Sequence, residues 1–304
     1  MALVTNSNYA GKAAGFYISA ALKEAKSLEH LTMIENIKYK SNIQIMSNDN
    51  ALIQNANCNV NLAGTLTLDE VVLEPKNLMI QTDLCKAELL DSWEALQLRA
   101  GAGAPPPPSF TDYVISYLGE IIANGVESDV WVGNNGAGRL LGFLDGGAGV
   151  ISTGAGIVAS VATAPYTAGN IIGNLQQLVS DWQGSTAVNT MGKEDVTIYV
   201  SKKTWSLYIS AISALTATPW GNMNKDYETL FEGHTLTVCP GMADDKAVVA
   251  QKSNLYFGTD LLSDQTRIQL LDMSALDGSD NIRCVARYSG GVQCGVNADI
   301  VYQS

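Results

Sequence analysis

The most regular hydrophobic pattern of the chain lies between Pro105 and Gly136. Apolar side chains recur there at spacings of three and four, which places them on one face of a helix. The residues that share this face are Phe110, Val114, Tyr117, Leu118, Ile121, Ile122, Val126 and Val130. The pattern therefore predicts one long helix over about 109–131, roughly 33 Å in length at about 1.5 Å per residue.

The ends and the polar side of this helix are also marked in the sequence. Ser109 is placed to cap free backbone N–H groups at the helix start. Asn124-Gly125 is typical of a helix end, but the apolar positions continue in register after it. We therefore expect the helix to continue through Gly125, at a cost of about 1 kcal/mol in helix propensity. The polar residues expected on the other faces are Asp112, Ser116, Glu120 and Glu127.

Between Asn36 and Glu74 the hydrophobic period changes to about 2 residues, which is typical of strands. The first strand alternates through Ile37, Tyr39, Ser41, Ile43 and Ile45, and the second through Val60, Leu62, Leu66, Leu68 and Val71. The residue types between them predict a tight turn. Because only alternate residues are apolar and an isolated ribbon is marginally stable, we expect a projecting hairpin that lies on another subunit. The candidate inter-subunit contacts at its tip are Ser47, Asn48, Asp49 and Asn50.

Two shorter elements connect the hairpin to the long helix. A strand is predicted at 71–81 and a helix at 86–98, followed by a Gly-Ala segment and four prolines that end at Pro108. Such a Pro-rich segment is either a rigid connector or a ligand for an aromatic groove. Its position directly before a helix start favours the connector.

The second half of the chain alternates between helical and strand patterns. Helices are predicted at 171–182 and after a cap at Ser201, and strands at 196–200, 234–239, 247–251 and 267–272. The last two strand patterns are Ile282–Tyr288 and Val292–Tyr302. The intervening Ser289-Gly290-Gly291 predicts a tight turn, so we expect a C-terminal hairpin.

Residues 1–35 mix small residues with a helical pattern. The apolar residues that can share one face are Ala20, Ala21, Leu22, Ala25, Leu28, Leu31 and Ile34. An isolated helix of this length is marginal in water. The segment is therefore either an arm that needs a partner surface or an ordinary packed N-terminal helix.

The long helix and its neighbours resemble a known arrangement. A strand-like LDEVVLEPKNLMIQTDL (68–84) and a KAELLDSWEAL helix (86–96) precede it, and an acidic turn with a Gly-Asn-rich loop, ESDVWVGNNGAG, follows it. Together they resemble the spine helix and its flanks in tailed-bacteriophage major capsid proteins of the Hong Kong 97 type. YVSKKTW, NLYFGTDL and the final RYSGGVQCGVNADIVY look like the axial domain and closing strands of the same family. The resemblance covers most of the chain, but it rests on element order and loose patterns rather than on an invariant motif.

The resemblance implies an α+β fold in which a peripheral domain carries the spine helix. The implied domains are an N-terminal arm (1–35), an extended-loop hairpin (36–70), a peripheral domain (71–165), an axial domain (166–288) and a closing strand (289–304). In this family the extended loop reaches over a neighbouring subunit. The implied function is structural: pentamers and hexamers self-assemble into the icosahedral head of a tailed virus that encloses double-stranded DNA. The implied location is the virion, after assembly in the host cytoplasm.

Composition bounds the partners of the chain. With 304 residues and 46% hydrophobic content, it has enough apolar material for one large or two interleaved domains. The net charge of −12 makes the surface as a whole repel nucleic acid, so an acidic shell lining would let DNA slide rather than bind. The basic residues of the first forty positions are solvated side chains of an arm or, alternatively, a local DNA contact. They are Lys12, Lys23, Lys26, Lys38 and Lys40.

Cysteine spacing and the apolar segments argue against a disulfide-rich or zinc-binding protein and against a membrane protein. The five cysteines, an odd number, are widely spaced, which disfavours a disulfide framework or a zinc site and favours buried thiols in a reducing compartment. They are Cys58, Cys85, Cys239, Cys284 and Cys294. The start of the sequence lacks the order of a signal peptide, so we expect cytosolic synthesis. Ala148–Ala164 is uncharged but short and rich in Gly and Ser, so we expect a tightly packed segment rather than a membrane span.

Candidate chemistry is sparse. Gly154–Ala159 matches the dinucleotide-binding pattern G-x-G-x-x-A, but Pro165 leaves little room for the helix that a pyrophosphate needs. The other candidate groups are His30 and His234 and the carboxylate pairs Asp244-Asp245 and Asp277–Asp280. The histidines lie beside no nucleophile motif, and the carboxylate pairs have the flanks of turns. We therefore predict no catalytic, cofactor or metal site and no enzyme activity.

Two expectations concern assembly. Some relatives of this family crosslink subunits through a lysine in the extended loop, but Ser41–Pro75 contains no lysine, so we expect no such bond. No long helical extension precedes the arm, which predicts a separate scaffolding protein or assembly without one. Portal and decoration proteins are further expected partners.

The alternatives to a capsid role are another virion protein, such as a tail tube or head decoration protein, and a cellular enzyme that uses the loop at Gly154.

Overall fold

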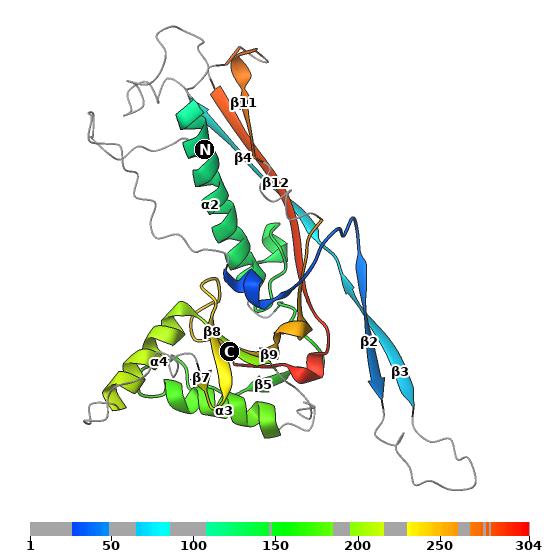
Figure 1. Ribbon diagram of the computed structural model, residues 1–304, viewed down its shortest axis with the longest axis vertical. Helices are drawn as coiled ribbons and strands as arrows, with labels where there is room; N and C mark the ends of the chain where they lie inside the picture. Colours follow the sequence, from blue (N-terminus) through cyan, green and yellow to red (C-terminus); the bar gives the residue numbers. More distant parts are fainter. Residues whose placement is uncertain are drawn as a thin grey trace.

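The structure is a computed structural model that describes residues 26–48, 65–85, 108–145, 148–184, 195–215, 230–260, 268–275, 278–279 and 281–303. Figure 1 shows an elongated molecule in which the long helix α2 (Pro108–Val132) lies along a narrow sheet at one end. A second sheet with two helices forms the other end, and the hairpin of β2 (Ser41–Asn48) and β3 (Leu66–Leu73) projects away from both. The fold class is α+β, as predicted.

The helix α2 confirms the prediction from the central hydrophobic pattern. It begins one residue before the predicted start and continues through Gly125, where an added Cβ would meet no atom closer than 4.0 Å. Ile122, Val126 and Val130 are buried, with exposed fractions of 5%, 3% and 0%. Glu127, which we expected on a polar face, is instead fully buried.

The narrow sheet lies against α2. Its strands are β1 (Thr32–Ile34), β4 (Lys76–Cys85), β10 (Leu255–Gly258), β11 (Ile268–Asp272) and β12 (Asn281–Cys294). β12 is central: it pairs antiparallel with β4 along one edge and with β11 and β10 along the other. Strand alternation places Leu78 and Ile80 against the hydrophobic core and Met79 on the opposite, exposed side.

The continuous strand β12 shows that the predicted C-terminal hairpin is wrong. Ser289, Gly290 and Gly291 lie inside the strand and form no turn. An added Cβ at Gly290 would lie 3.1 Å from Cζ of Phe257, and one at Gly291 would lie 2.9 Å from the backbone oxygen of Glu74. The two glycines therefore permit a close approach of neighbouring segments, a role that has the same sequence signal as a tight turn.

The second sheet has the strand order β5–β13–β9–β6–β8–β7. In that order its strands are Val158–Ser160, Val301–Gln303, Ala247–Gln251, Val196–Val200, His234–Val238 and Leu230–Phe231. The helices α3 (Ile171–Gly184) and α4 (Lys202–Leu215) share one buried apolar cluster with this sheet. The predicted helices at 171–182 and after Ser201 and the predicted strands at 196–200, 234–239 and 247–251 are confirmed. Oγ of Ser201 accepts a hydrogen bond from the Thr204 N–H at 3.1 Å, as expected of a cap.

Five short 3₁₀ helices complete the described elements. They are η1 (Lys26–His30), η4 (Asn135–Ala137), η6 (Lys252–Asn254), η8 (Met273–Ala275) and η9 (Asn297–Asp299). Along the described residues, no helix combines the length and the apolar content needed to cross a membrane. The segment Ala148–Ala164 forms turns and the short strand β5, with Ile151 fully buried but Val161 83% exposed, so it is only partly the packed segment that we expected.

The hairpin confirms two antiparallel strands but corrects their connection. The register runs from Ser41 opposite Leu73 to Asn48 opposite Leu66. Ser47 and Asn48 therefore belong to β2 and form no tight turn, while Asp49 and Asn50 lie outside the described residues. Turn-prone residue types were overridden here by cross-strand pairing, which dominates intrinsic preference in sheets.

The predicted strand at 71–81 is divided into β3 and β4 at Glu74-Pro75. Pro75 has no backbone N–H to continue the ladder, so the chain changes direction there. β11 and β12, which the sequence placed with the axial residues, pair with each other and with β4 in the narrow sheet. The predicted helix at 86–98, the polyproline connector and most of the arm lie outside the described residues.

Trp131, at the end of α2, connects the two sheets. Its ring lies 5.4 Å from that of Phe143 and 5.7 Å from that of Tyr199, measured between centroids. Tyr199 belongs to β6 of the second sheet and shares a buried apolar cluster with Val126 and Val130 of α2. One hydrophobic cluster therefore includes residues of both sheets, while the cluster formed with α3 and α4 is a second one.

Candidate assembly surfaces

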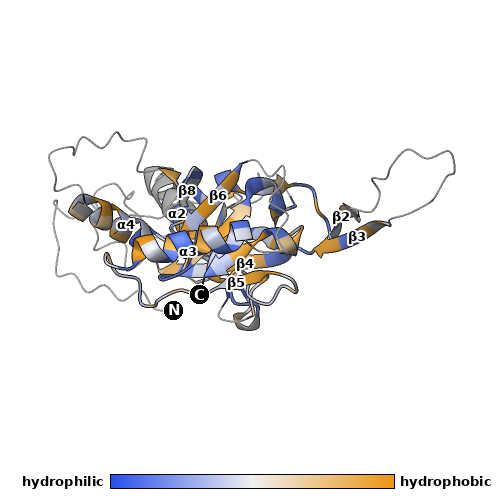
Figure 2. Ribbon diagram, turned by 90° about the horizontal axis from the view of Figure 1, so that it is seen from below, coloured by the Kyte–Doolittle hydropathy of each residue, from blue (hydrophilic) through white to orange (hydrophobic). Residues whose placement is uncertain are grey.

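The hairpin carries an exposed apolar row on one face. The register places Met46, Leu66, Leu68 and Val72 on the same side of the ribbon, because directly paired residues share a face. Their exposed fractions are 67%, 61%, 61% and 40%. Figure 2 shows hydrophobic residues along β3 where the hairpin extends away from the body. We call these four residues the apolar row; within a single chain it has no covering element among the described residues.

The root of the hairpin is anchored to the body by a few specific contacts. Ile37 and Leu73 are 6% and 1% exposed and lie over Gly258 of β10. Nε2 of Gln293 donates to the backbone oxygen of Val72 at 3.0 Å. These contacts hold the ribbon where it leaves the narrow sheet.

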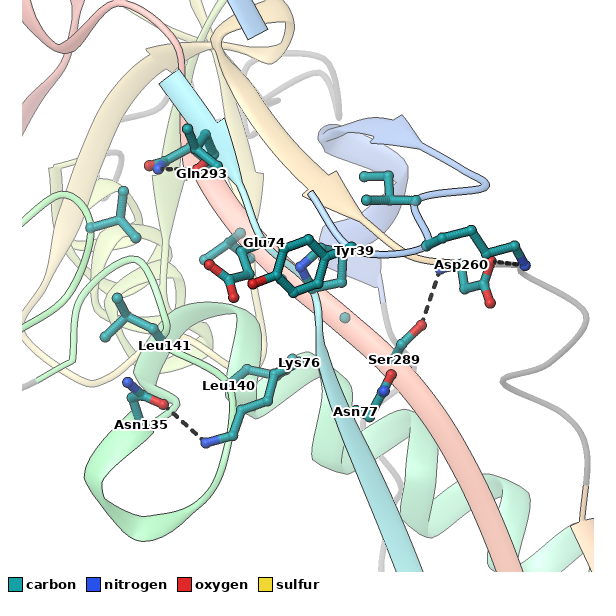
Figure 3. Close-up of a pocket in the computed structure, with 18 residues that line it drawn as sticks. Tyr39, Glu74, Lys76, Asn77, Asn135, Leu140, Leu141, Asp260, Ser289 and Gln293 are labelled. Atoms are coloured by element: carbon teal, nitrogen blue, oxygen red, sulfur yellow. Dashed lines mark hydrogen bonds and ion pairs between the residues drawn. The ribbon is translucent and has the colours of Figure 1, made fainter. Parts of the chain in front are cut away.

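A cleft of about 700 Å³ lies beside this root (Figure 3). Tyr39 and Glu74 line it from the hairpin, and Asn135 and Leu141 line it from the loop that follows α2. Nζ of Lys76 donates across it to Oδ1 of Asn135 at 2.9 Å. The cleft therefore lies between the hairpin base and the loop after α2, and Lys76 of β4 joins that loop to the narrow sheet.

Glu127 joins three parts of the chain at the far end of α2. Its carboxylate accepts hydrogen bonds from the backbone N–H of Ser27 at 3.0 Å, from Oγ of Ser27 at 2.6 Å and from the N–H of Gly241 at 3.0 Å. Nε1 of Trp131 donates to the same Ser27 hydroxyl at 2.7 Å. An added Cβ at Gly241 would overlap the backbone oxygen of Glu127, so the contact requires glycine. Sequence reasoning missed this role, because the two donors are distant in the chain.

Asp129 is a second buried carboxylate on the same helix. Nε of Arg139 lies 2.7 Å from its Oδ1, while the Asp129 side chain is only 2% exposed. Burial raises the pKa of the Asp129 carboxyl, and the charge of Arg139 offsets part of that rise. The pair fixes the loop after α2 to the helix.

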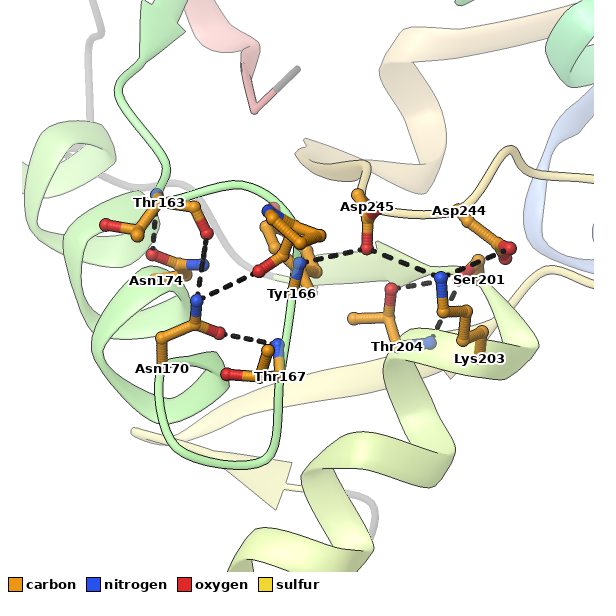
Figure 4. Close-up of polar contacts among 11 residues, drawn as sticks. Thr163, Tyr166, Thr167, Asn170, Asn174, Ser201, Lys203, Thr204, Asp244 and Asp245 are labelled. Carbon is orange, nitrogen blue, oxygen red and sulfur yellow. Dashed lines mark hydrogen bonds and ion pairs between the residues drawn. The ribbon is translucent and has the colours of Figure 1, made fainter.

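Two asparagines shape the loop that precedes α3 (Figure 4). Nδ2 of Asn170 donates to the backbone oxygens of Thr163 and Pro165, at 3.1 and 3.0 Å. Asn174 accepts from the Thr163 N–H at 3.0 Å and donates back to its oxygen at 3.0 Å. These bonds fix a surface loop of the second sheet without creating a pocket of reactive groups.

Asp244 and Asp245 lie in a turn, as predicted. Asp245 has a positive φ of 60° and accepts a hydrogen bond from the Tyr166 N–H at 3.1 Å. Nζ of Lys203 lies 3.5 Å from Asp244 and 3.8 Å from Asp245. Asp245 therefore binds a backbone N–H, and both carboxylates lie near the ammonium group of Lys203. The two carboxylates do not pair with each other as an acid–base dyad. Of the second predicted pair, Asp277 and Asp280 lie outside the described residues.

The other candidate groups are placed apart from one another. The backbone oxygen of His30 accepts from the Tyr199 hydroxyl at 3.0 Å, and His234 packs edge-on against Trp182 at 5.5 Å between centroids. Gly154–Ala159 leads into β5 rather than into a helix, so it lacks the geometry of a pyrophosphate site. Within the described residues, no three His, Cys, Asp or Glu side chains gather to hold a metal ion.

The described cysteines are free thiols. Cys239, Cys284 and Cys294 are buried and Cys85 is partly buried, while Cys58 lies outside the described residues. Burial raises the pKa of Cys239 to about 12 and that of Cys284 to about 11. A thiol with a raised pKa is a poor nucleophile, so these cysteines act as small apolar core residues.

No protein-family model matches the sequence, and no curated protein sequence matches it. Solved structures do match the fold. The capsid of Myoviridae Phage XM1 gives a TM-score of 0.61 at 12% identity and covers 99% of this chain and 98% of that one. The capsid of an empty GTA particle gives 0.59 at 13% identity, covering 94% and 91%. The capsid structure of Cyanophage P-SCSP1u gives 0.55 at 12% identity, covering 95% and 90%.

These likenesses extend over nearly the whole of both chains. In this chain the matched length spans a long helix beside a narrow sheet, a projecting hairpin and a second sheet (Figure 1). The chain therefore has the fold of tailed-phage capsid proteins, as its resemblance to the Hong Kong 97 type implied.

Proposed function

We propose that the chain is a major capsid protein that self-assembles into the icosahedral head of a tailed double-stranded DNA bacteriophage. The observation that carries the proposal is a capsid fold matched along 99% of the chain and 98% of the matched chain. A match of that extent supports a role for the whole chain in a shell. The proposed role is structural and involves no catalysis.

The apolar row supports a role in contacts between copies. Full burial of a large apolar side chain contributes about 1.5–3 kcal/mol, so three or four such residues on a projecting ribbon are a strong driving force for association. A neighbouring copy is the proposed cover. Ser47, Asn48, Asp49 and Asn50, at and beyond the end of β2, are proposed as further contacts to that neighbour.

The remaining parts of the proposal concern assembly and partners. Heterologous contacts repeated around closed rings give the proposed pentamers and hexamers. Separate scaffolding, portal or decoration proteins complete the head, which forms in the host cytoplasm and remains in the virion. The acidic chain encloses DNA without sequence-specific binding, because its net charge of −12 repels phosphate.

We also propose domain boundaries and the absence of a covalent crosslink. The arm (1–35), extended-loop hairpin (36–70), peripheral (71–165), axial (166–288) and closing (289–304) segments are proposed as assembly units. Since Ser41–Pro75, the stretch that contains the strands β2 and β3, has no lysine, the proposed shell depends on noncovalent burial. A denaturing gel of assembled particles should show only the single-chain band; covalent ladders that survive reductant would contradict this.

Electron microscopy of the expressed full chain tests the function. We expect closed shells, either from this chain alone or after co-expression with a scaffolding protein. Open tubes would favour a tail-tube role, and single particles the size of one chain under all conditions would favour a decoration protein. Either result would overturn the proposed capsid role.

A further inference from the structure

The sequence contains two Asn-Gly pairs, Asn124-Gly125 and Asn135-Gly136, and the structure places them in different surroundings. An asparagine that precedes glycine is chemically labile, because glycine has no side chain to hinder attack of its backbone nitrogen on the asparagine side chain. The attack requires rotation of the peptide between the two residues. The local structure therefore decides which pair can react.

Asn135-Gly136 lies on an exposed single turn. Asn135 begins η4 in the loop after α2, and both residues of the pair are exposed. The backbone oxygen of Asn135 accepts a turn bond from the Gly138 N–H at 3.1 Å, and the Gly136 N–H forms no hydrogen bond within the described residues. Rotation of this peptide therefore breaks one exposed bond, and the attacking nitrogen is already free.

A cation lies against the group that the nitrogen attacks. Nζ of Lys76 donates to Oδ1 of Asn135 at 2.9 Å and to the backbone oxygen of Arg139 at 3.2 Å (Figure 3). Lys76 itself is held in the narrow sheet, where it pairs with Gly290 of β12. Oδ1 gains negative charge as the nitrogen adds to Cγ, and an ammonium group at hydrogen-bond distance stabilises that charge.

Asn124-Gly125 lacks these features. The pair lies inside α2, between the buried residues Ile122 and Val126, so rotation of its peptide would break the helix. Oδ1 of Asn124 is buried and has no hydrogen-bond partner within the described residues. Asn124 is therefore an unreactive reference within the same chain.

We propose that Asn135 is a site of spontaneous deamidation, at which Lys76 stabilises the charge that develops on Oδ1. The backbone nitrogen of Gly136 forms a bond to Cγ of Asn135 and gives its proton to hydroxide. The bond from Cγ to Nδ2 breaks, and Nδ2 takes a proton from water and leaves as ammonia. Water then opens the cyclic imide at either carbonyl carbon, which gives aspartate or isoaspartate. Water is the only co-reactant, and nothing is oxidised or reduced.

The two products change the loop in different ways. Aspartate presents a carboxylate to Lys76, so the hydrogen bond between the loop and the narrow sheet becomes an ion pair. Isoaspartate leads the backbone through the former side chain and lengthens it by a carbon, which breaks the turn η4. Ageing therefore changes the join between the loop and the narrow sheet irreversibly. The inference concerns a single chain and does not rest on shell assembly.

Peptide mapping by mass spectrometry of the unassembled full chain tests the site. The chain is incubated at mildly alkaline pH in ordinary water and in water with heavy oxygen, and the peptides that contain Asn124 and Asn135 are followed over time. We expect Asn135 to gain the mass that exchanges NH₂ for OH, with the new oxygen taken from water, while Asn124 stays unchanged. An Asn135 that stays unchanged, or that reacts no faster than Asn124, would overturn the proposal.

Lys76→Met tests the role of the ammonium group. We expect conversion of Asn135 to slow by roughly threefold or more, because the developing charge loses a donor. The matched control is Lys252→Met, which removes another lysine that donates to a backbone oxygen, that of Glu29 at 2.6 Å, and should leave the rate unchanged. An unchanged rate in Lys76→Met, or equal slowing in Lys252→Met, would overturn the role of Lys76.

Gly136→Ala keeps the proposal testable if Lys76→Met does not fold. The added methyl group hinders the attacking nitrogen, and its nearest neighbour is Oδ1 of Asn134 at 3.1 Å, the end of an exposed side chain. We expect conversion of Asn135 nearly to stop. Asn124 reports folding in each variant, because it becomes reactive only when α2 unfolds. An undiminished rate in a folded Gly136→Ala would contradict the cyclic route.

Discussion

Glu127 stabilises the junction of three chain segments through one buried carboxyl group. A carboxylate is an acceptor only, and here every contact comes from a donor: the N–H and hydroxyl of Ser27 and the N–H of Gly241. Hydrogen bonds to charged groups contribute more to stability than neutral ones. One side chain therefore joins η1, the end of α2 and the turn after β8. We expect substitutions of this side chain to destabilise the protein.

Glu127→Gln is the sharpest test of this junction. One oxygen faces the N–H of Ser27 and the other faces the N–H of Gly241, so the amide NH₂ group of glutamine must meet a donor in either orientation. We expect the free energy of unfolding of the unassembled chain to fall by about 2 kcal/mol. Glu120→Gln, at an exposed position of the same helix, is the control and should change little. Equal effects in denaturant titrations of both variants would contradict this role.

The buried carboxyl of Asp129 predicts that the free energy of unfolding depends on pH. Its carboxyl has a raised pKa because it is buried, although Arg139 offsets part of the rise, and Tyr288 is the other titratable group nearby. A carboxyl with a raised folded-state pKa contributes stability when protonated and loses it as pH rises through that value. We therefore compare the free energy of unfolding of the protein with that of Asp129→Asn at each pH. The difference, protein minus variant, should decrease as pH rises from about 4, near the ordinary pKa of an aspartate, toward neutral pH. A difference that is flat or rises with pH would contradict the burial effect.

The role of a residue could be predicted from the sequence where its partner lies nearby in the chain, and could not where its partner is distant. Ser201 was identified as a cap because its partner is three residues away. Glu127 was expected on a polar face, because periodicity along α2 says nothing of Ser27 or Gly241, which lie 100 and 114 positions away in sequence.

The projecting hairpin predicts the effect of changing a single apolar side chain on association. Leu68→Gln makes the centre of the apolar row polar without changing a buried residue of the single chain, since Leu68 is 61% exposed. We expect assembly to be lost or to require at least tenfold more protein, while the thermal midpoint of the unassembled chain changes little. Asp69→Asn, on the opposite face of the same strand, is the control. Normal assembly of Leu68→Gln in light scattering would argue against the row as a contact.

The strand β12 predicts opposite outcomes for two glycine substitutions. Gly291→Ala places a Cβ 2.9 Å from the backbone oxygen of Glu74, so β12 and the hairpin base must separate. Gly173→Ala, inside α3, meets nothing within 4 Å and gains up to about 1 kcal/mol of helix propensity. We expect a lower thermal midpoint for the first variant and an unchanged or higher one for the second. A stabilised Gly291→Ala would show that the close approach is not needed.

Elements with strong local periodicity were predicted well, and those decided by distant pairing were not. α2, β6 and β9 follow patterns that their own residues carry. The Asn-rich segment at Ser47 and the Gly-Gly pair at Gly290 carry turn signals, yet pairing with β3 and β4 keeps both in strands. Local turn chemistry did not indicate which strands would be partners.

At the scale of the whole molecule, one hydrophobic cluster at the end of α2 includes residues of both sheets, and a ribbon extends from the body with its apolar row uncovered (Figure 1). The order of elements was predictable from the sequence, because the resemblance depended on order. The assignment of β11 and β12 to the narrow sheet was not, because β12 pairs with a strand about 200 residues earlier in the chain. Identities of 12–13% to solved capsid chains show how little of this architecture depends on particular side chains.

A cryo-electron microscopy reconstruction of particles assembled from the full chain, at a resolution that traces side chains, tests the central claim most directly. The claim is that a second copy covers the projecting hairpin. We expect closed shells in which Met46, Leu66 and Leu68 are buried against the neighbouring subunit. Shells in which these three side chains face solvent, or in which the hairpin folds back onto its own chain, would contradict the account.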